Sequence, residues 1–172
     1  EIVARLCGRA VRRSRNRLYE RAIQDYDEAI RLNPQYADNY YNRGLAYLFL
    51  DQYERAIQDY DEAIRLNPQD ASAYNSRGLA YARLDQYEQA IQDFDEAIRL
   101  NPQNAGAYHN RGVAYARLGQ YERAIQDFGE AIRLDPQNAG AYHNRGVAYG
   151  RIGKSIEEER DFAKATEIGY GP

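Results

Sequence analysis

The stretch AIQDYDEAIRLNP occupies residues 22–34 and returns unchanged at residues 56–68. Close variants occupy residues 90–102 and 124–136, and the last of them reads AIQDFGEAIRLDP. The prolines that end the four copies are spaced by 34 residues. A period of this length predicts an array of small units, each of which buries its apolar faces by stacking on its neighbours.

Each period contains two apolar stripes of helical spacing. When Ala37 is taken as position 1, Gly44 at position 8 and Ala56 at position 20 leave room where two helices must approach closely. Asp51, followed by Glu three residues later, is expected to cap the start of a second helix. The Asn-Pro pair that closes the copy is expected to end that helix, because the residue before proline avoids helical backbone angles. Each complete repeat is therefore predicted to form a helix, a tight turn, a second helix and a short linker.

This spacing resembles the tetratricopeptide repeat family, and the first complete repeat shows it at Tyr40, Gly44, Tyr47, Ala56, Tyr60, Ala63 and Pro68. The resemblance covers essentially the whole chain. It implies an all-α fold, a right-handed α-solenoid of stacked antiparallel helix hairpins. The expected division is a degenerate basic first repeat with a normal second helix at 1–36, complete repeats at 37–70, 71–104 and 105–138, and a capping repeat at 139–172.

Position 7 departs from the family pattern, which usually has an apolar residue there. Here every repeat has arginine, at Arg9, Arg43, Arg77, Arg111 and Arg145. We expect these side chains to form ion pairs with second-helix acids such as Asp59, Asp93 and Asp127, and contact with a ligand is the alternative. Further acids on the second helices, as in Asp61–Arg65 and Asp95–Arg99, have the i,i+4 spacing of salt-bridged helix surfaces.

The two ends of the array deviate from the repeat. Leu6, Ala10 and Arg13 stand where the first helix should carry its aromatic, glycine and tyrosine. Six arginines and no acid lie from residue 5 to residue 17, which indicates either a frayed helix with a solvated face or a basic patch for an acidic partner. Cys7 is interpreted as a small packing residue.

At the other end, Glu158 replaces the small residue of position 20, and Gly-Tyr replaces Asn-Pro at residues 169–170. A terminal repeat needs a polar outer face because nothing stacks on it. The last repeat is therefore predicted to be a cap at which the array ends.

Composition argues against several classes of protein. Lys and Arg number 23 against 26 Asp and Glu, for a net charge of −3, whereas nucleic-acid binding needs a cationic excess. No apolar run approaches the roughly 18 residues of a membrane helix, so no membrane partner is expected. No targeting segment is visible, so the compartment is undetermined and the cytoplasm is only the default expectation.

No constellation of catalytic residues is present, and we expect a protein that is not an enzyme and has no metal or cofactor. The glycines are spaced for helix packing and not for a phosphate loop. His109 and His143 share position 5 of neighbouring repeats, which places them roughly 10 Å apart, a helix-packing distance. That separation is too large for both to ligate one Zn²⁺.

The family resemblance implies that first helices line a concave groove that holds a peptide or protein segment. One end of this groove is expected to be apolar and aromatic, and the other to carry a ladder of arginines that holds carboxylates or merely neutralises neighbouring acids. The predicted groove residues are Tyr41, Asn42, Leu45, Leu48, Phe49, Asn75, Leu79, Arg83, His109, Asn110, Arg117, His143, Asn144 and Arg151, and Val113 and Val147 occupy groove position 9 of the last two repeats.

The leading functional hypothesis is a protein–protein interaction scaffold whose partner is a peptide or protein, with acidic groups as a possible feature. Two alternatives remain open, self-assembly into homo-oligomers or filaments and a regulatory fragment of a larger enzyme. Clamps that hold chaperone tails use lysine at position 5 and asparagine at position 9 in this family. Position 9 is Leu or Val here, so binding of that type is not expected.

Overall fold

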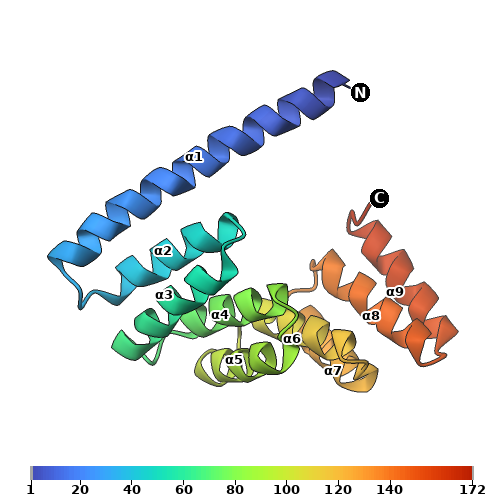
Figure 1. Cartoon of the computed structure of the whole chain (residues 1–172). Helices are drawn as coiled ribbons and strands as arrows, with labels where there is room; N and C mark the ends of the chain where they lie inside the picture. The colour runs from blue at the N-terminus through green and yellow to red at the C-terminus, as the bar shows by residue number, and fades with distance from the viewer. Residues whose placement is uncertain (1, 172) are drawn as a thin grey trace. The chain divides into compact units, whose positions relative to one another are not determined.

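The computed structural model describes the backbone of residues 2–171 and the side chains of residues 15–171. Helices are the regular structure of this part of the chain, and they are labelled α1 to α9 (Figure 1). The chain divides into two compact units, residues 1–80 and 81–172, and the boundary falls within α4 (Ala71–Arg83).

The first unit contains α1 (Ile2–Leu32), α2 (Ala37–Phe49), α3 (Tyr53–Leu66) and most of α4. Helix α2 packs against both α1 and α3. Ala56, Tyr60 and Ala80 form a buried cluster. A methyl group added at Gly44 would lie only 2.8 Å from the Tyr60 ring, which confirms that position 8 is small because the ring lies against the backbone there.

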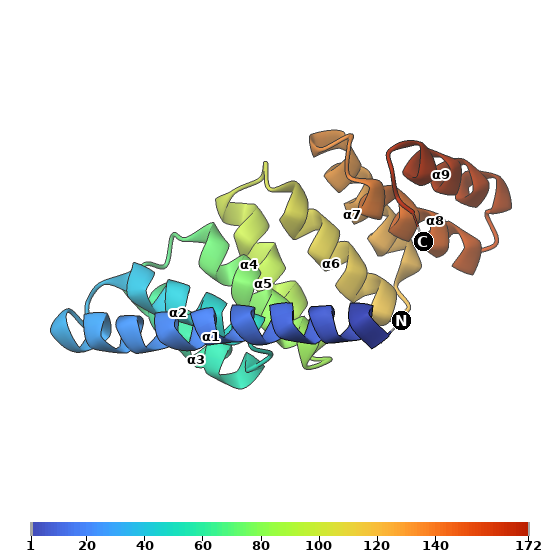
Figure 2. The same ribbon diagram turned by 90° about the horizontal axis from the view of Figure 1, so that it is seen from above.

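The second unit contains α5 (Tyr87–Leu100), α6 (Ala105–Arg117), α7 (Tyr121–Leu134), α8 (Ala139–Arg151) and α9 (Ser155–Glu167). Consecutive helices pack in pairs, and Figure 2 shows α8 and α9 side by side at the C-terminal end. The buried Phe128 ring lies against Gly112, where an added methyl carbon would lie 2.8 Å away. Helices α3, α5 and α7 end two residues before Pro68, Pro102 and Pro136, as the Asn-Pro signal predicts.

The first repeat differs from the expected hairpin, because α1 is one continuous helix (Figure 1). The complete repeats turn at position 15 with a residue of positive φ, Asp51 at 59° or Gly119 at 73°. The equivalent residue is Arg17, whose side chain disfavours left-handed backbone, so the helix continues through it. The side chains of Leu6, Cys7, Ala10 and the arginines before residue 15 lie outside the described residues, as do the interpretations placed on them.

The prediction that Asp51 caps α3 is wrong. The N-cap residue is Gln52, which makes no side-chain cap hydrogen bond. Asp51 lies one residue earlier, in left-handed conformation, and its carboxylate accepts a hydrogen bond of 2.7 Å from the Tyr53 hydroxyl. Side-chain caps are found instead on first helices, where Asn104 accepts from Ala107 N at 3.2 Å and Asn138 from Ala141 N at 2.9 Å.

Candidate functional site

The position-7 arginines connect neighbouring helices through paired carboxylates. In the first unit, Arg43 Nε and Nη2 donate to both carboxylate oxygens of Asp59 at 2.8 and 2.6 Å. Arg43 Nη1 donates to Asp27 of α1 at 2.6 Å. The expected ion pair between positions 7 and 23 is therefore confirmed for this repeat, and a second pair to the preceding helix accompanies it.

The same arrangement recurs with Arg111 in the second unit. Its Nε and Nη2 donate to Asp127 at 2.8 and 2.7 Å, and its Nη1 donates to Asp95 at 2.6 Å. Arg77 Nη1 likewise donates to Asp61 of the preceding helix at 2.6 Å. Asp61 and Asp95 therefore contribute to interhelix pairs.

The arginines of the second helices pair along their own helices. Arg65 donates to Glu62 and Arg99 to Glu96, both at i,i+3 spacing. These contacts are solvent-exposed, as expected of surface salt bridges, but the acid in each is not the i,i+4 residue that the sequence suggested. Exposed pairs of this kind contribute little to stability.

Arg145 departs from the pattern on one side. Its Nε and Nη2 donate to Asp161 at 2.7 and 2.8 Å, which confirms the position-23 pair in the last repeat. The preceding helix α7 has Gly129 where the three preceding repeats have aspartate, and a Cβ there would lie 3.7 Å from Arg145 Nη1. Among the described residues, none accepts a hydrogen bond from this nitrogen.

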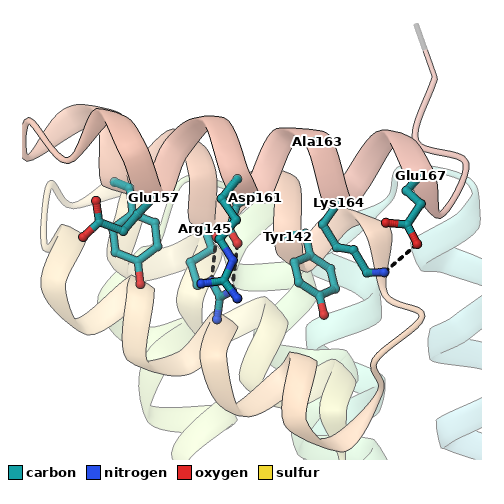
Figure 3. A pocket seen from close by; sticks show the side chains of 9 residues that line it. Tyr142, Arg145, Glu157, Asp161, Ala163, Lys164 and Glu167 are labelled. Carbon is teal, nitrogen blue, oxygen red and sulfur yellow. Dashed lines mark hydrogen bonds and ion pairs between the residues drawn. The ribbon is translucent and has the colours of Figure 1, made fainter.

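A cavity borders Arg145, and we call it the α8–α9 cavity. It has a volume of about 630 Å³ and is lined by Tyr142, Arg145, Tyr149, Glu157, Arg160, Asp161, Ala163, Lys164 and Glu167. Figure 3 shows Arg145 pointing to Asp161 at its centre, with Lys164 turned to Glu167, to which it donates at 2.7 Å. Both Tyr142 and Tyr149 place their rings near the guanidinium, at 5.6 and 5.9 Å from its carbon.

A second cavity lies between first helices of the second unit, and we call it the α6–α8 cavity. Its volume is about 410 Å³. It is lined by Val113, Ala116, Arg117, Tyr121, Phe128, Asn144, Val147, Ala148 and Arg151. Three predicted groove residues meet here, Arg117, Asn144 and Arg151, together with the two position-9 valines. Tyr121, the first residue of α7, was not among the predicted residues, because second-helix position 17 is read from sequence as packing.

The two histidines are not among the residues that line this cavity, and both pack on aromatic rings. His109 makes an edge contact with Phe128, with ring centroids 5.6 Å apart, and Asn144 Nδ2 lies 3.4 Å from its Nε2. Its Nδ1 is buried and has no hydrogen-bond partner among the described residues. Burial lowers the pKa of His109 below its ordinary value, because desolvation disfavours the charged ring. His143 stacks on Tyr170 at 4.3 Å, so both rings contribute much of their surface to packing.

The predicted groove residues of the first unit divide between packing and exposure. Tyr41, Leu45 and Leu48 pack against the buried cluster around Tyr60. Phe49 is 55% exposed and stacks on Tyr19 of α1, with centroids 5.1 Å apart. Three further predicted groove residues of this unit are partly buried, namely Asn42, Asn75 and Leu79. In the second unit, Asn110 is partly buried and Arg83 is exposed.

The described part of the chain was also searched for metal sites and membrane-spanning helices. It contains no cluster of three or more side chains able to hold a metal ion. None of its helices combines the length and apolar character needed to cross a membrane.

Comparison with known proteins identifies the repeat. A family model described as TPR repeat matches residues 13–50 and 114–153, and two tetratricopeptide repeat models match residues 41–105 and 94–126. No curated protein sequence matches the chain significantly.

Solved structures share the fold over most of the chain. The crystal structure of MamA has a TM-score of 0.83 and 28% identity, and covers 87% of this chain and 88% of its own. YrrB, described as a TPR protein with an unusual peptide-binding site, has a TM-score of 0.76 and 26% identity over 89% and 79%. The first TPR of Spaghetti (RPAP3), bound to the HSP90 peptide SRMEEVD, has a TM-score of 0.67 and 27% identity over 67% and 92%. The fold is therefore the all-α tetratricopeptide solenoid, and the chain belongs to the tetratricopeptide repeat family.

Proposed function

We propose that this chain is a non-enzymatic interaction module that binds an extended protein segment in the α6–α8 cavity. The single observation that carries the proposal is the lining of that cavity, which combines apolar and cationic side chains. Val113 and Val147 are apolar members of this lining, and Val147 is 40% exposed. Exposed apolar surface rimmed by polar residues is typical of interaction sites.

The cationic groups of the cavity favour a ligand with carboxylates. Arg117 and Arg151 are both exposed, and both line the cavity. Arginine binds carboxylates through two parallel charge-assisted hydrogen bonds, and the Asn144 amide adds a donor and an acceptor. The chemistry fits a segment that places one apolar side chain between the valines and acidic groups beside the arginines.

Two similar structures support a peptide partner. YrrB is described as having a peptide-binding site, and the RPAP3 repeat is bound to a peptide that contains three acidic residues, SRMEEVD. The present chain has valine at the position where chaperone-tail clamps of this family have asparagine. Arg117 and Arg151, four residues further along each helix, are the groups that would hold a carboxylate here.

A peptide-display screen with the full chain tests this proposal. Selected peptides should be enriched in segments that combine apolar and acidic residues, and Arg117→Glu or Arg151→Glu should weaken their binding at least about tenfold, the value of one charge-assisted hydrogen bond. Arg133→Glu is the matched control, because Arg133 is exposed on α7, pairs with Glu130 and lies outside the cavity lining. Binding that survives Arg117→Glu and Arg151→Glu unchanged would refute the proposal.

Self-association is a second candidate, and the continuous α1 favours it. Leu18 and Leu32 are 65% and 69% exposed on this helix, and their separation of 14 residues places them on nearly the same face. Sedimentation over a concentration series separates the two functions. A mass that increases with concentration and falls back in Leu18→Glu would support self-association, and a constant monomer mass would exclude it.

A further inference from the structure

The acid that bridges neighbouring repeats is missing at one place. Position 25 carries aspartate in the first three repeats, at Asp27, Asp61 and Asp95, and each of these accepts a hydrogen bond of 2.6 Å from Nη1 of the next position-7 arginine. The next repeat has Gly129 at this position. Arg145 therefore has one carboxylate partner, Asp161, where Arg43 and Arg111 have two.

The guanidinium of Arg145 is held in place although its Nη1 has no hydrogen-bond acceptor among the described residues. Two hydrogen bonds to Asp161 fix its plane, and the rings of Tyr142 and Tyr149 flank it. Arg111 is held in the same way, by Asp127 and by the rings of Tyr108 and Tyr115. Because the Arg145 side chain is already held in place, it loses little conformational entropy when a ligand binds Nη1.

A cavity borders this side chain. Arg145 lines the α8–α9 cavity, and Gly129 of α7 presents no side chain to Nη1, from which a Cβ at that residue would lie 3.7 Å. Of the other charged groups that line the cavity, Lys164 is paired with Glu167, and Arg160 and Glu157 carry opposite charges. A carboxylate that entered here would meet the same donor that Asp95 meets at Arg111.

We propose that the α8–α9 cavity binds an Asp or Glu side chain of a partner protein, whose carboxylate accepts from Arg145 Nη1 in the way that Asp95 accepts from Arg111. This site shares no lining residue with the α6–α8 cavity, so it is a second interaction surface and does not depend on the function proposed above. The occupant is a carboxylate because that is the group which this donor binds in the three other repeats.

Arginine side-chain NMR signals of the ¹⁵N-labelled full chain test the proposal, with N-acetylglutamate amide as the probe and the glutamine analogue as the neutral control. Arg145 should show a saturable shift with the glutamate compound only. Gly129→Asp should weaken this response about tenfold or more, because an internal carboxylate then occupies Nη1. Asp95→Gly, which recreates the gap, should make Arg111 respond in the same way.

The exposed Arg133 reports non-specific ionic contact within the same spectra. An Arg145 shift no larger than that of Arg133 would mean that water alone covers Nη1, and the proposal would be overturned. A response that persists in Gly129→Asp would overturn it as well. Should Asp95→Gly fail to fold, Gly129→Asp decides the matter alone, since aspartate is at least as compatible with a helix as glycine.

Discussion

Arg43 and Asp59 form an ion pair with two parallel hydrogen bonds, of 2.8 and 2.6 Å, between the two helices of the first complete repeat. The Asp59 side chain is 7% exposed and that of Arg43 19%. Hydrogen bonding to Asp59 raises the pKa of Arg43, while burial raises the pKa of Asp59 because desolvation opposes its ionisation. The guanidinium remains protonated under all usual conditions, and both hydrogen bonds require a carboxylate, so the pair is ionic.

Breaking this pair from one side should be costly. Asp59→Ala leaves the half-buried guanidinium with Asp27 alone, and we expect the free energy of unfolding in urea to fall by about 2–3 kcal/mol. The double variant Arg43→Leu/Asp59→Ala should lose less than the sum of its single variants, because no uncompensated charge remains. Glu62→Ala, which breaks an exposed pair on the same helix, is the control and should change stability little. Equal losses in Asp59→Ala and Glu62→Ala would contradict a structural role for the Arg43–Asp59 pair.

The protein should be more stable with phenylalanine in place of Tyr60. The ring of Tyr60 is fully buried against Gly44, and burial raises the pKa of this tyrosine. Its hydroxyl meets the geometric criteria of a hydrogen bond with no described residue, although Ser76 is near enough to lower the pKa by a smaller amount. Phe128 fills the same position of a later repeat against Gly112. Tyr60→Phe should therefore raise the free energy of unfolding by about 1 kcal/mol, by removing a buried hydroxyl that has lost its water. Phe128→Tyr is the reverse experiment and should lower stability. A loss of stability in Tyr60→Phe would show that the hydroxyl is hydrogen-bonded in solution.

The helices of the complete repeats could be predicted because a single residue with one structural role determines each helix end or close contact. Pro68 excludes a helical residue before it, and Gly44 is small because the Tyr60 ring occupies the place of a side chain. The turn was misread because aspartate suits two roles, helix cap and left-handed turn residue, and Asp51 takes the second. The continuous α1 was not predicted, because its cause is the lack of a glycine or aspartate at the turn position, where this repeat has Arg17. Sequence patterns that mark the start or end of a helix do not reveal such a missing turn residue.

The candidate sites were less predictable, because they depend on how helices meet. The 34-residue register assigned Arg117 and Arg151 to the same face, but the cavity that they share with Val113 and Val147 follows from the packing of α6 beside α8. His109 belongs to the same face by register, yet its ring packs against the Phe128 ring. Gly129 is visible as a substitution in the repeated stretch. Its effect on Arg145 emerges only when α7 and α8 are packed together.

The free energy of unfolding should depend on which residue replaces Gly119, in the turn between α6 and α7. This residue has φ of 73° and no atom within 4 Å of where a Cβ would lie, so the cost of a side chain there is conformational and not steric. Gly119→Ala should lower the free energy of unfolding by about 1 kcal/mol. Gly119→Asp should cost less, since Asp51 and Asp85 adopt the same conformation in their own turns. Thermal unfolding of both variants measures the difference, and equal losses would mean that aspartate has no local advantage at this position.

His109 should make the fold sensitive to acid. The folded chain has a lowered His109 pKa, so below the ordinary value of 6.5 the unfolded chain takes up a proton that the folded chain does not. The free energy of unfolding should therefore decrease as the pH falls below that value, until the folded-state pKa is reached. His109→Asn, which copies the residue at the same position of the preceding repeat, should remove this part of the pH dependence while leaving stability at pH 8 little changed. Titration of the His109 ring by NMR provides the direct measurement. A midpoint at or above 6.5 would mean that the Nδ1 of the folded protein reaches water, and the acid sensitivity would then have to come from other groups.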